Sequence, residues 1–178
     1  DLQLDNKLLV AGDFTSINGV SRNRLARLNE NGFLDPIFDT GDGANDSIRV
    51  LEVYKRGPQT GRILMAGFFT QISGTNRPGI ARLNQNGSVD LTFDPGSGTD
   101  NAIYAMKIQP DDRIMIGGGF SVYNGIRRNF IARMNSDGSL DGTFDPGTGF
   151  DGTVFALDVQ NDGKVVVGGS FQIINGVG

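Results

Sequence analysis

Short apolar runs recur along the chain, and each is followed by glycine and other turn-forming residues. The clearest series reads KLLVAGDF, RILMAGFF, RIMIGGGF and KVVVGGSF, and it ends at Phe14, Phe69, Phe120 and Phe171. Residues 62–112 and 113–163 align without a gap, and 23 of the 51 aligned positions are identical. Self-similarity at a fixed period indicates a repeat architecture. We therefore divide this one repeat array (1–178) into units at approximately 7–61, 62–112 and 113–163, with a partial unit at 164–178.

Each unit contains four runs of the type that forms β-strands. In the third copy of the repeat they are Arg113–Phe120, Phe130–Asn135, Ser139–Phe144 and Thr153–Val159. These runs are short and rich in Val, Ile, Leu and Phe, and Gly, Asn and Asp separate them, as in antiparallel sheets joined by tight turns. No long helical pattern with capping residues interrupts them. We expect no long helix, and strand over about 45% of the chain or more.

The strongest strand runs, such as KVVVGG and RILMAG, are apolar on both faces. A sheet with one solvated face alternates apolar and polar residues, so both faces of these sheets must be covered. Sheets stacked like propeller blades provide that cover, and four strands in about 50 residues match one blade. The sequence predicts an all-β fold of tandem four-stranded antiparallel blades of a β-propeller. The alternative is an open superhelical stack of the same sheets.

The number of repeat units indicates what the chain packs against. Three full units and part of a fourth are present, whereas closed propellers typically have about four to eight blades. We therefore expect the open faces to be covered by the rest of a longer repeat chain or by other copies of the chain itself.

Composition narrows the function. The chain has 27 Gly and 20 acidic residues, of which only Glu30 and Glu52 are glutamate, so the acids belong mostly to turn chemistry. The net charge of −4 argues against a nucleic-acid binder, which needs a basic surface. His, Cys and Trp are absent, which excludes imidazole and thiolate chemistry and disulfides. No apolar run approaches the length of a membrane span, so we expect none.

An aspartate follows a phenylalanine once in every unit. Such repeated acids could bind Ca²⁺, which prefers several oxygen ligands, although no D-x-D-x-D-G loop is present. They could instead accept hydrogen bonds from backbone N–H groups and cap turns. A catalytic site is rarely repeated in every unit, so we expect turn capping, no catalytic residue and no cofactor. The three candidate Ca²⁺ ligands are Asp39, Asp94 and Asp145.

An arginine recurs inside the apolar strand motif I/L-A-R-L/M-N. One interpretation is a ring of ligand-facing arginines. The other is a buried arginine that pairs with a repeat aspartate while its stem packs on a phenylalanine, and we favour it. The structural repeat positions are then Arg27, Arg82 and Arg133, with Phe38, Phe93 and Phe144 beside the acids and Phe14, Phe69, Phe120 and Phe171 at equivalent, largely buried places.

Four groups of columns recur together: GG-x-F, N-G-x-x-R-N-x-I-A-R-L-N, D-G-S-L-D-x-T-F and D-P-G-x-G. The third copy carries them most completely, from Gly118 to Gly149. In this combination they resemble the delta-60 repeat, a propeller-type family of large bacterial surface and secreted proteins. The departures are conservative or local, such as Ala66 for the first glycine and Thr40 for the proline. The resemblance implies a blade architecture and an extracellular or cell-surface location in bacteria. The family has no agreed biochemical activity, so the resemblance indicates location and architecture more than function.

Three functions remain. The chain could be a non-enzymatic extracellular scaffold or adhesion module that presents loops to a glycan or protein ligand. It could alternatively be the structural subunit of an extracellular filament or homopolymer built by end-to-end packing. A propeller enzyme is the third, and a non-repeating set of polar residues at one end of the axis would favour it. The polar positions are nearly the same in every copy, which argues against the enzyme, and images of the purified protein as particles or filaments would separate the other two functions.

Overall fold

The structure, a computed structural model, describes all 178 residues and consists of strands and turns. It contains no helix that could cross a membrane. The strands are β1 (Leu8–Ala11), β2 (Ser16–Ile17), β3 (Val20–Ser21), β4 (Leu25–Leu28), β5 (Ile48–Val53), β6 (Ile63–Gly67), β7 (Gln71–Ile72), β8 (Thr75–Asn76), β9 (Ile80–Leu83), β10 (Ile103–Ile108), β11 (Ile114–Gly118), β12 (Val122–Tyr123), β13 (Ile126–Arg127), β14 (Ile131–Met134), β15 (Val154–Val159) and β16 (Val165–Gly169).

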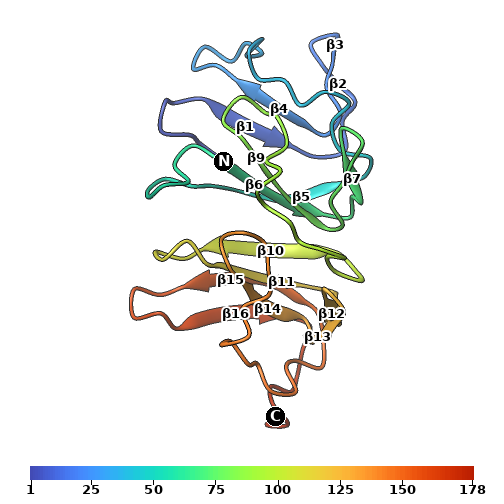
Figure 1. Ribbon diagram of the computed structural model, residues 1–178, viewed down its shortest axis with the longest axis vertical. Coiled ribbons are helices and arrows are strands. Elements are labelled where there is room, and N and C mark those ends of the chain that lie inside the picture. The colour runs from blue at the N-terminus through green and yellow to red at the C-terminus, as the bar shows by residue number, and fades with distance from the viewer.

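The longer strands form one antiparallel sheet per blade. Two sheets have three strands, in the orders β5–β6–β9 and β10–β11–β14, and two have a pair each, β1–β4 and β15–β16. We call the regions around these sheets blade 1 (1–38), blade 2 (44–93), blade 3 (99–144) and blade 4 (150–178). The blades follow one another along the long axis in chain order, and they do not close into a ring within these residues (Figure 1). The expected all-β class with tandem blades is confirmed.

The hydrophobic core lies between the blades. Strand β10 packs against β5 on one side and against β15 on the other, so the first strands of successive blades lie next to each other. Three apolar clusters fill the three junctions. Phe38 and Met65 belong to the first, Phe93 and Met106 to the second, and Met115 and Phe150 to the third. Runs such as ILMAG in β6 are buried along their whole length because each blade has a neighbour on both faces.

The fourth run of each unit is shorter than expected. It forms a single bridge to the third strand, as between Met134 and Leu140, and then turns away. The reason is the next residue: Oδ1 of Asp141 accepts a hydrogen bond from the N–H of Thr143, which starts a turn that a strand cannot continue. Strand therefore covers about a third of the chain, and the expectation of about 45% or more was wrong.

Small two-stranded hairpins, which the sequence analysis did not predict, follow β1, β6 and β11. They are β2–β3, β7–β8 and β12–β13. In β12–β13 the two turn residues, Asn124 and Gly125, both have positive φ, at 47° and 76°. That pair of angles is typical of the type I′ turn, which suits the twist of a two-residue hairpin and favours Asn-Gly.

The phenylalanine that ends the second strand run lies at the same place in every blade. Phe69 and Phe120 are fully buried. Phe14 and Phe171 are half-buried, since they stand in blades 1 and 4, each of which has only one neighbour in this chain. The column was expected to be largely buried throughout, and burial is complete only where a blade packs on both sides.

Candidate functional site

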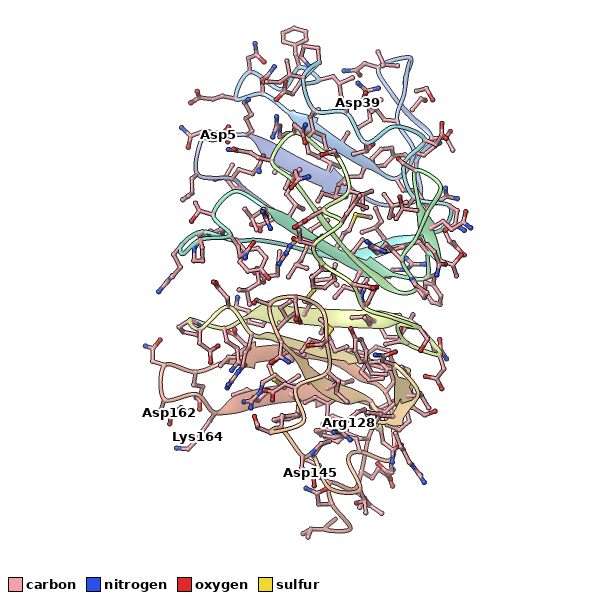
Figure 2. The ribbon with its side chains drawn as sticks, viewed as in Figure 1. Asp5, Asp39, Arg128, Asp145, Asp162 and Lys164 are labelled. Carbon is pink, nitrogen blue, oxygen red and sulfur yellow. The ribbon has the colours of Figure 1, made fainter.

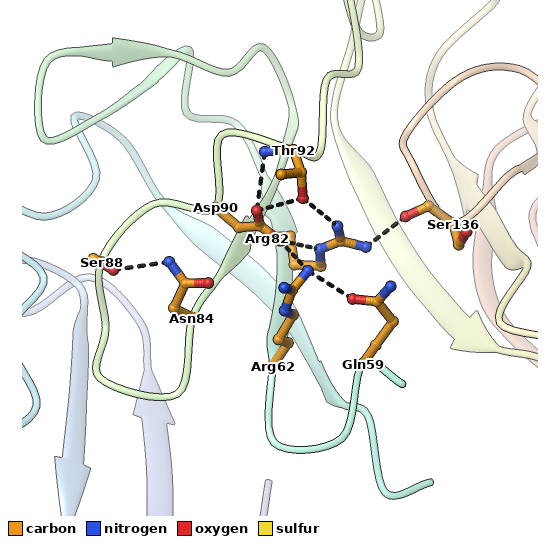
Figure 3. Close-up of polar contacts among 8 residues, drawn as sticks. All are labelled: Gln59, Arg62, Arg82, Asn84, Ser88, Asp90, Thr92 and Ser136. Carbon is orange, nitrogen blue, oxygen red and sulfur yellow. Dashed lines mark hydrogen bonds and ion pairs between the residues drawn. The ribbon is translucent and has the colours of Figure 1, made fainter. Parts of the chain in front are cut away.

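A repeated cluster, which we call the arginine clamp, joins blade 1 to blade 2 and blade 2 to blade 3. In blade 2 it consists of Arg82 from β9, Asp90 from the segment that follows, and Phe93. Figure 3 shows Arg82 and Asp90. Nε of Arg82 donates to Oδ2 of Asp90 at 2.6 Å, and its carbon Cζ lies 5.1 Å from the centre of the Phe93 ring. Arg82 is 2% exposed, and Arg62 also contacts Asp90, at 2.7 Å. The buried ions are therefore paired, as burial of charge requires.

The clamp crosses to the following blade through the backbone of a turn. The guanidinium of Arg82 donates to the carbonyl oxygen of Ser136 in blade 3 (Figure 3). Arg27 does the same from blade 1: it pairs with Asp35 at 2.9 Å and donates to the Gln85 carbonyl of blade 2 at 2.7 Å. The arginine column is thus structural in these two blades.

Blade 3 has the same cluster without the crossing bond. Arg133 donates to Asp141 at 2.6 Å and to the hydroxyl of Thr143 at 3.0 Å, and it lies 5.2 Å from the centre of the Phe144 ring. It makes no hydrogen bond to blade 4, and its side chain is 19% exposed. Arg133 therefore makes the contacts of the clamp within its own blade and lacks the hydrogen bond to the next blade.

A backbone contact beside the clamp requires glycine. The N–H of Asp39 donates to the carbonyl of Asn86 at 2.9 Å, which brings the chain of blade 1 against Gly87 of blade 2. A Cβ on Gly87 would stand 2.6 Å from the Asp39 carbonyl oxygen, and the φ of Gly87 is +97°. Gly138 occupies the same place against Asp94. The Asn-Gly and Asp-Gly turns therefore serve as joints between blades.

The clamp aspartates are held in the ionised form. Burial raises the pKa of Asp90, but hydrogen bonds from Thr92 and Arg82 outweigh it, and the net pKa is lowered. In Asp141 the Thr143 hydroxyl has the largest effect and, with Arg133, lowers the pKa to about 2. The pKa of Asp35 is lowered as well, because bonds from Lys7, Ile37 and Arg27 outweigh burial. Such carboxylates hold no proton to donate near neutral pH.

The three candidate Ca²⁺ ligands cap turns. The Oδ1 atom of Asp39 accepts the N–H of Gly41 at 2.9 Å. Asp94 and Asp145 accept the corresponding glycine N–H groups at 3.0 and 2.9 Å. Asp39 and Asp145 lie toward opposite ends of the stack (Figure 2). No three acidic side chains gather where they could hold a metal ion together, so these residues do not form a shared site.

Charged residues also link the middle of the first strands. The Nζ atom of Lys107 in β10 lies 3.4 Å from Glu52 in β5 and 3.6 Å from Asp158 in β15. Burial raises the pKa of Glu52, and Lys107 opposes that rise. This is the one carboxylate whose pKa moves toward the range of a general acid, and it stands in an ion pair between blades.

The sequence analysis missed a row of aromatic residues at the start of the first strands. In β5, β10 and β15 a bulge interrupts the pairing at the second residue, which is Arg49, Tyr104 or Phe155. A bulge re-aims the side chain that it carries. Phe68, which follows β6, lies 5.9 Å from Tyr104 between ring centres, and Tyr104 lies 5.6 Å from Phe155. We call these three rings the aromatic row.

Arg49 extends the row toward blade 1. Its guanidinium carbon Cζ lies 5.3 Å from the centre of the Phe68 ring, and a terminal nitrogen lies 3.8 Å from a carboxylate oxygen of Asp13. Aligning the units would have shown that Arg49, Tyr104 and Phe155 share one column. The place of Phe68 between them follows only from the packing of blades.

Comparison with known proteins agrees with this architecture. The family described as "Domain of unknown function (DUF5122) beta-propeller" matches residues 3–38, 59–93, 109–144 and 160–178. No curated protein and no solved structure matches the chain. The first three matched segments end at Phe38, Phe93 and Phe144, so the matched repeat contains the arginine, the aspartate and the phenylalanine of each clamp. The matches cover well over half of the sequence and agree with the resemblance to a propeller-type repeat. The chain belongs to the DUF5122 beta-propeller family.

Proposed function

We propose that the chain is a non-enzymatic repeat module of a bacterial surface or secreted protein, and that it holds a recognition surface on a stiff scaffold. The observation that carries the proposal is a contrast between columns of the repeat. The clamp has the same arginine, aspartate and phenylalanine in blades 1 to 3. The exposed bulge column differs in every copy, with Arg49, Tyr104 and Phe155. A constant frame with a variable surface is how repeat proteins recognise ligands.

The state of the acidic groups supports a role without catalysis. A general acid works best with a pKa near the operating pH. The clamp aspartates have lowered pKa values and full sets of hydrogen-bond donors. Glu52, whose pKa is raised, is tied to Lys107 across a blade junction. With no histidine or cysteine in the chain, neither an imidazole base nor a nucleophilic thiolate is present.

The proposed location rests on the likeness of the repeat columns to the delta-60 repeat of bacterial surface and secreted proteins. An antibody raised against residues 1–178 tests it on cells of the source organism. We expect labelling of intact cells or of the culture medium. Labelling that appears only after the cells are permeabilised would contradict the location.

The adhesion role is tested with the purified protein. Beads coated with the chain should bind source cells or their extracellular matrix more than beads coated with a heat-unfolded sample. Negative-stain images of the same preparation should show discrete particles. Regular filaments that grow with protein concentration would favour the structural polymer instead. We expect no turnover of any substrate that is incubated with the purified chain. Turnover that is lost when one residue found in a single copy of the repeat is substituted would refute the non-enzymatic role.

A further inference from the structure

The aromatic row lies on the part of the blade that packing constrains least. The arginines of the clamps in blades 1 and 2 reach the next blade, and the turn glycines Gly87 and Gly138 pack against the segment that follows the preceding blade. At the row, by contrast, Phe68 of blade 2 is replaced by Gly119 in blade 3, and the bulge column changes its chemistry from Arg to Tyr to Phe. Exposure of large apolar groups has a cost unless something covers them. Variation together with exposed aromatic rings indicates a surface that contacts a ligand.

The three rings form one apolar stripe across blades 2, 3 and 4. Phe68 is 39% exposed, Phe155 is 55% exposed, and Tyr104 between them is half-buried. Neighbouring rings are in contact at an interplanar angle of 74° for the first pair and 52° for the second, so no polar group separates them. A stripe of this kind offers ring faces and edges to an extended partner that is itself partly apolar.

Gly119 keeps one side of Tyr104 open. A Cβ on Gly119 would stand 3.6 Å from the Tyr104 ring and 3.7 Å from the side-chain amide of Asn101. The Oδ1 atom of Asn101 accepts the N–H of Ala102 at 2.7 Å, whereas its Nδ2 makes no hydrogen bond within the chain. A free amide donor therefore stands beside an accessible tyrosine ring.

A small pocket adjoins the row between blades 2 and 3. It has a volume of about 200 Å³, and Phe68, Thr70, Thr99, Asp100 and Asn101 are among its lining residues. The hydroxyl of Thr99 is buried and has no hydrogen-bond partner. A buried polar group without a partner is uncommon and indicates that something else supplies the bond. The lining of the pocket therefore includes one hydroxyl that has no partner within the chain.

We propose that the aromatic row and this pocket bind a neutral oligosaccharide chain. A sugar ring has apolar C–H faces that stack on aromatic rings and a rim of hydroxyls that pair with amides and hydroxyls. Asn101 is an uncharged, exposed group of that kind. The one cation of the row, Arg49, faces the carboxylate of Asp13, and the chain carries a net charge of −4, so an acidic polymer fits less well. This inference rests on the proposed recognition function and names its ligand class.

The chain provides its own optical probe for the binding. It has three tyrosines and no tryptophan. Tyr54 and Tyr123 are 1% and 0% exposed, so Tyr104 is the tyrosine that a bound sugar would reach. We expect a saturable change in tyrosine fluorescence when cellohexaose, xylohexaose, laminarihexaose or chitohexaose is added in turn. Tyr104→Phe should abolish most of the change while calorimetric binding of the same sugar persists.

The variants separate stacking from folding. Phe155→Ala and Phe68→Ala should each weaken binding about tenfold, the effect of one aromatic contact. Phe33→Ala is the matched control, since Phe33 is 67% exposed and belongs to a turn of blade 1 outside the row. It should bind like the parent chain. All variants should keep the parent melting temperature within about 3 °C, because none of these side chains belongs to the buried core.

The outcomes decide the proposal. It is overturned if none of the four sugars gives a saturable signal, or if Phe155→Ala and Phe68→Ala bind like Phe33→Ala. It is equally overturned if a proline-rich peptide binds the row and the sugars do not, because aromatic grooves also accept that ligand. A negative sugar result combined with labelling of intact cells would refute this ligand and leave the proposed location standing.

Discussion

Replacing Arg82 by methionine should destabilise the joint between blades 2 and 3. Methionine keeps most of the apolar stem and removes the guanidinium, which is buried and bonds to Asp90, Thr92 and Ser136. The Asp90 carboxylate would stay buried with Arg62 as its one remaining cation, at 2.7 Å. Breaking a buried ion pair costs about 3–5 kcal/mol. Because Arg62 compensates in part, we expect about 3 kcal/mol, a large share of the stability of an ordinary domain.

The matched control is Arg133→Met. Arg133 makes the same bonds to its aspartate and threonine but none to the next blade, and it is more exposed. We expect about 1–1.5 kcal/mol for this change. The difference between the two variants then reports the bond to the Ser136 carbonyl, because a hydrogen bond from a charged group contributes about 1.5–3 kcal/mol.

Urea unfolding followed by far-ultraviolet circular dichroism measures both variants against the parent, with the slope of each transition checked for a change in cooperativity. Hydrogen exchange of blade 3 amides would show whether the loss is local to the joint. The reasoning is refuted if Arg82→Met costs less than about 1 kcal/mol. It is refuted as well if the two variants lose the same amount, because the inter-blade bond would then contribute nothing.

Further substitutions and conditions test other parts of the structure. Phe120→Ala should cost about 3–5 kcal/mol in urea unfolding, and Phe171→Ala less than half of that because Phe171 is half-buried; equal losses would contradict the burial argument. Gly87→Ala should cost about 2 kcal/mol or more, since its φ of +97° and the nearby Asp39 carbonyl both oppose a Cβ; a melting temperature equal to the parent's would be contrary to this. The pKa of Asp141 in the folded protein is about 2, below its value in the unfolded chain. The ionised carboxylate should therefore stabilise the fold fully above about pH 4, and this stabilisation should be lost as the pH falls toward 2. In Asp141→Asn that part of the acid dependence should be missing, and an unchanged pH profile of the urea midpoint would argue against the assignment. Millimolar Ca²⁺ should leave the melting temperature within about 1 °C, and a larger saturable rise would restore the candidate metal role of the turn aspartates.

The repeat, the all-β class and the burial of both sheet faces could be predicted because each depends on the order of apolar and polar residues within short segments of the sequence. The run ILMAG of β6 is apolar at every position, and only a neighbour on each face explains that. The fourth strand could not be predicted in the same way. LDGTF has the alternation of a strand, but Asp141 bonds to the backbone two residues on, and this local bond turns the chain.

The candidate site could be predicted only in part. A pairing between the repeated arginine and an aspartate was among the expectations, whereas the bond to the next blade joins residues more than 50 positions apart and leaves no local signal. The aromatic row depends on a bulge and on the stacking of three blades. The sequence alone does not show that the rings of Phe68 and Phe155 lie on either side of Tyr104.

The arginine clamp has a consequence for how such arrays change length. One period of the sequence encodes both the arginine that reaches forward and the turn that receives it, as Arg82 and Ser136 do across successive copies. A tandem duplication of one period therefore brings a complete joint with it, and a deletion of one period rejoins two compatible ends. The array can gain or lose whole blades by recombination without a compensating mutation. The connection between β5 and β6, at Lys55–Gly61, is longer than its counterparts in the other blades, and the clamp of blade 2 is intact, so extra length in this loop is tolerated.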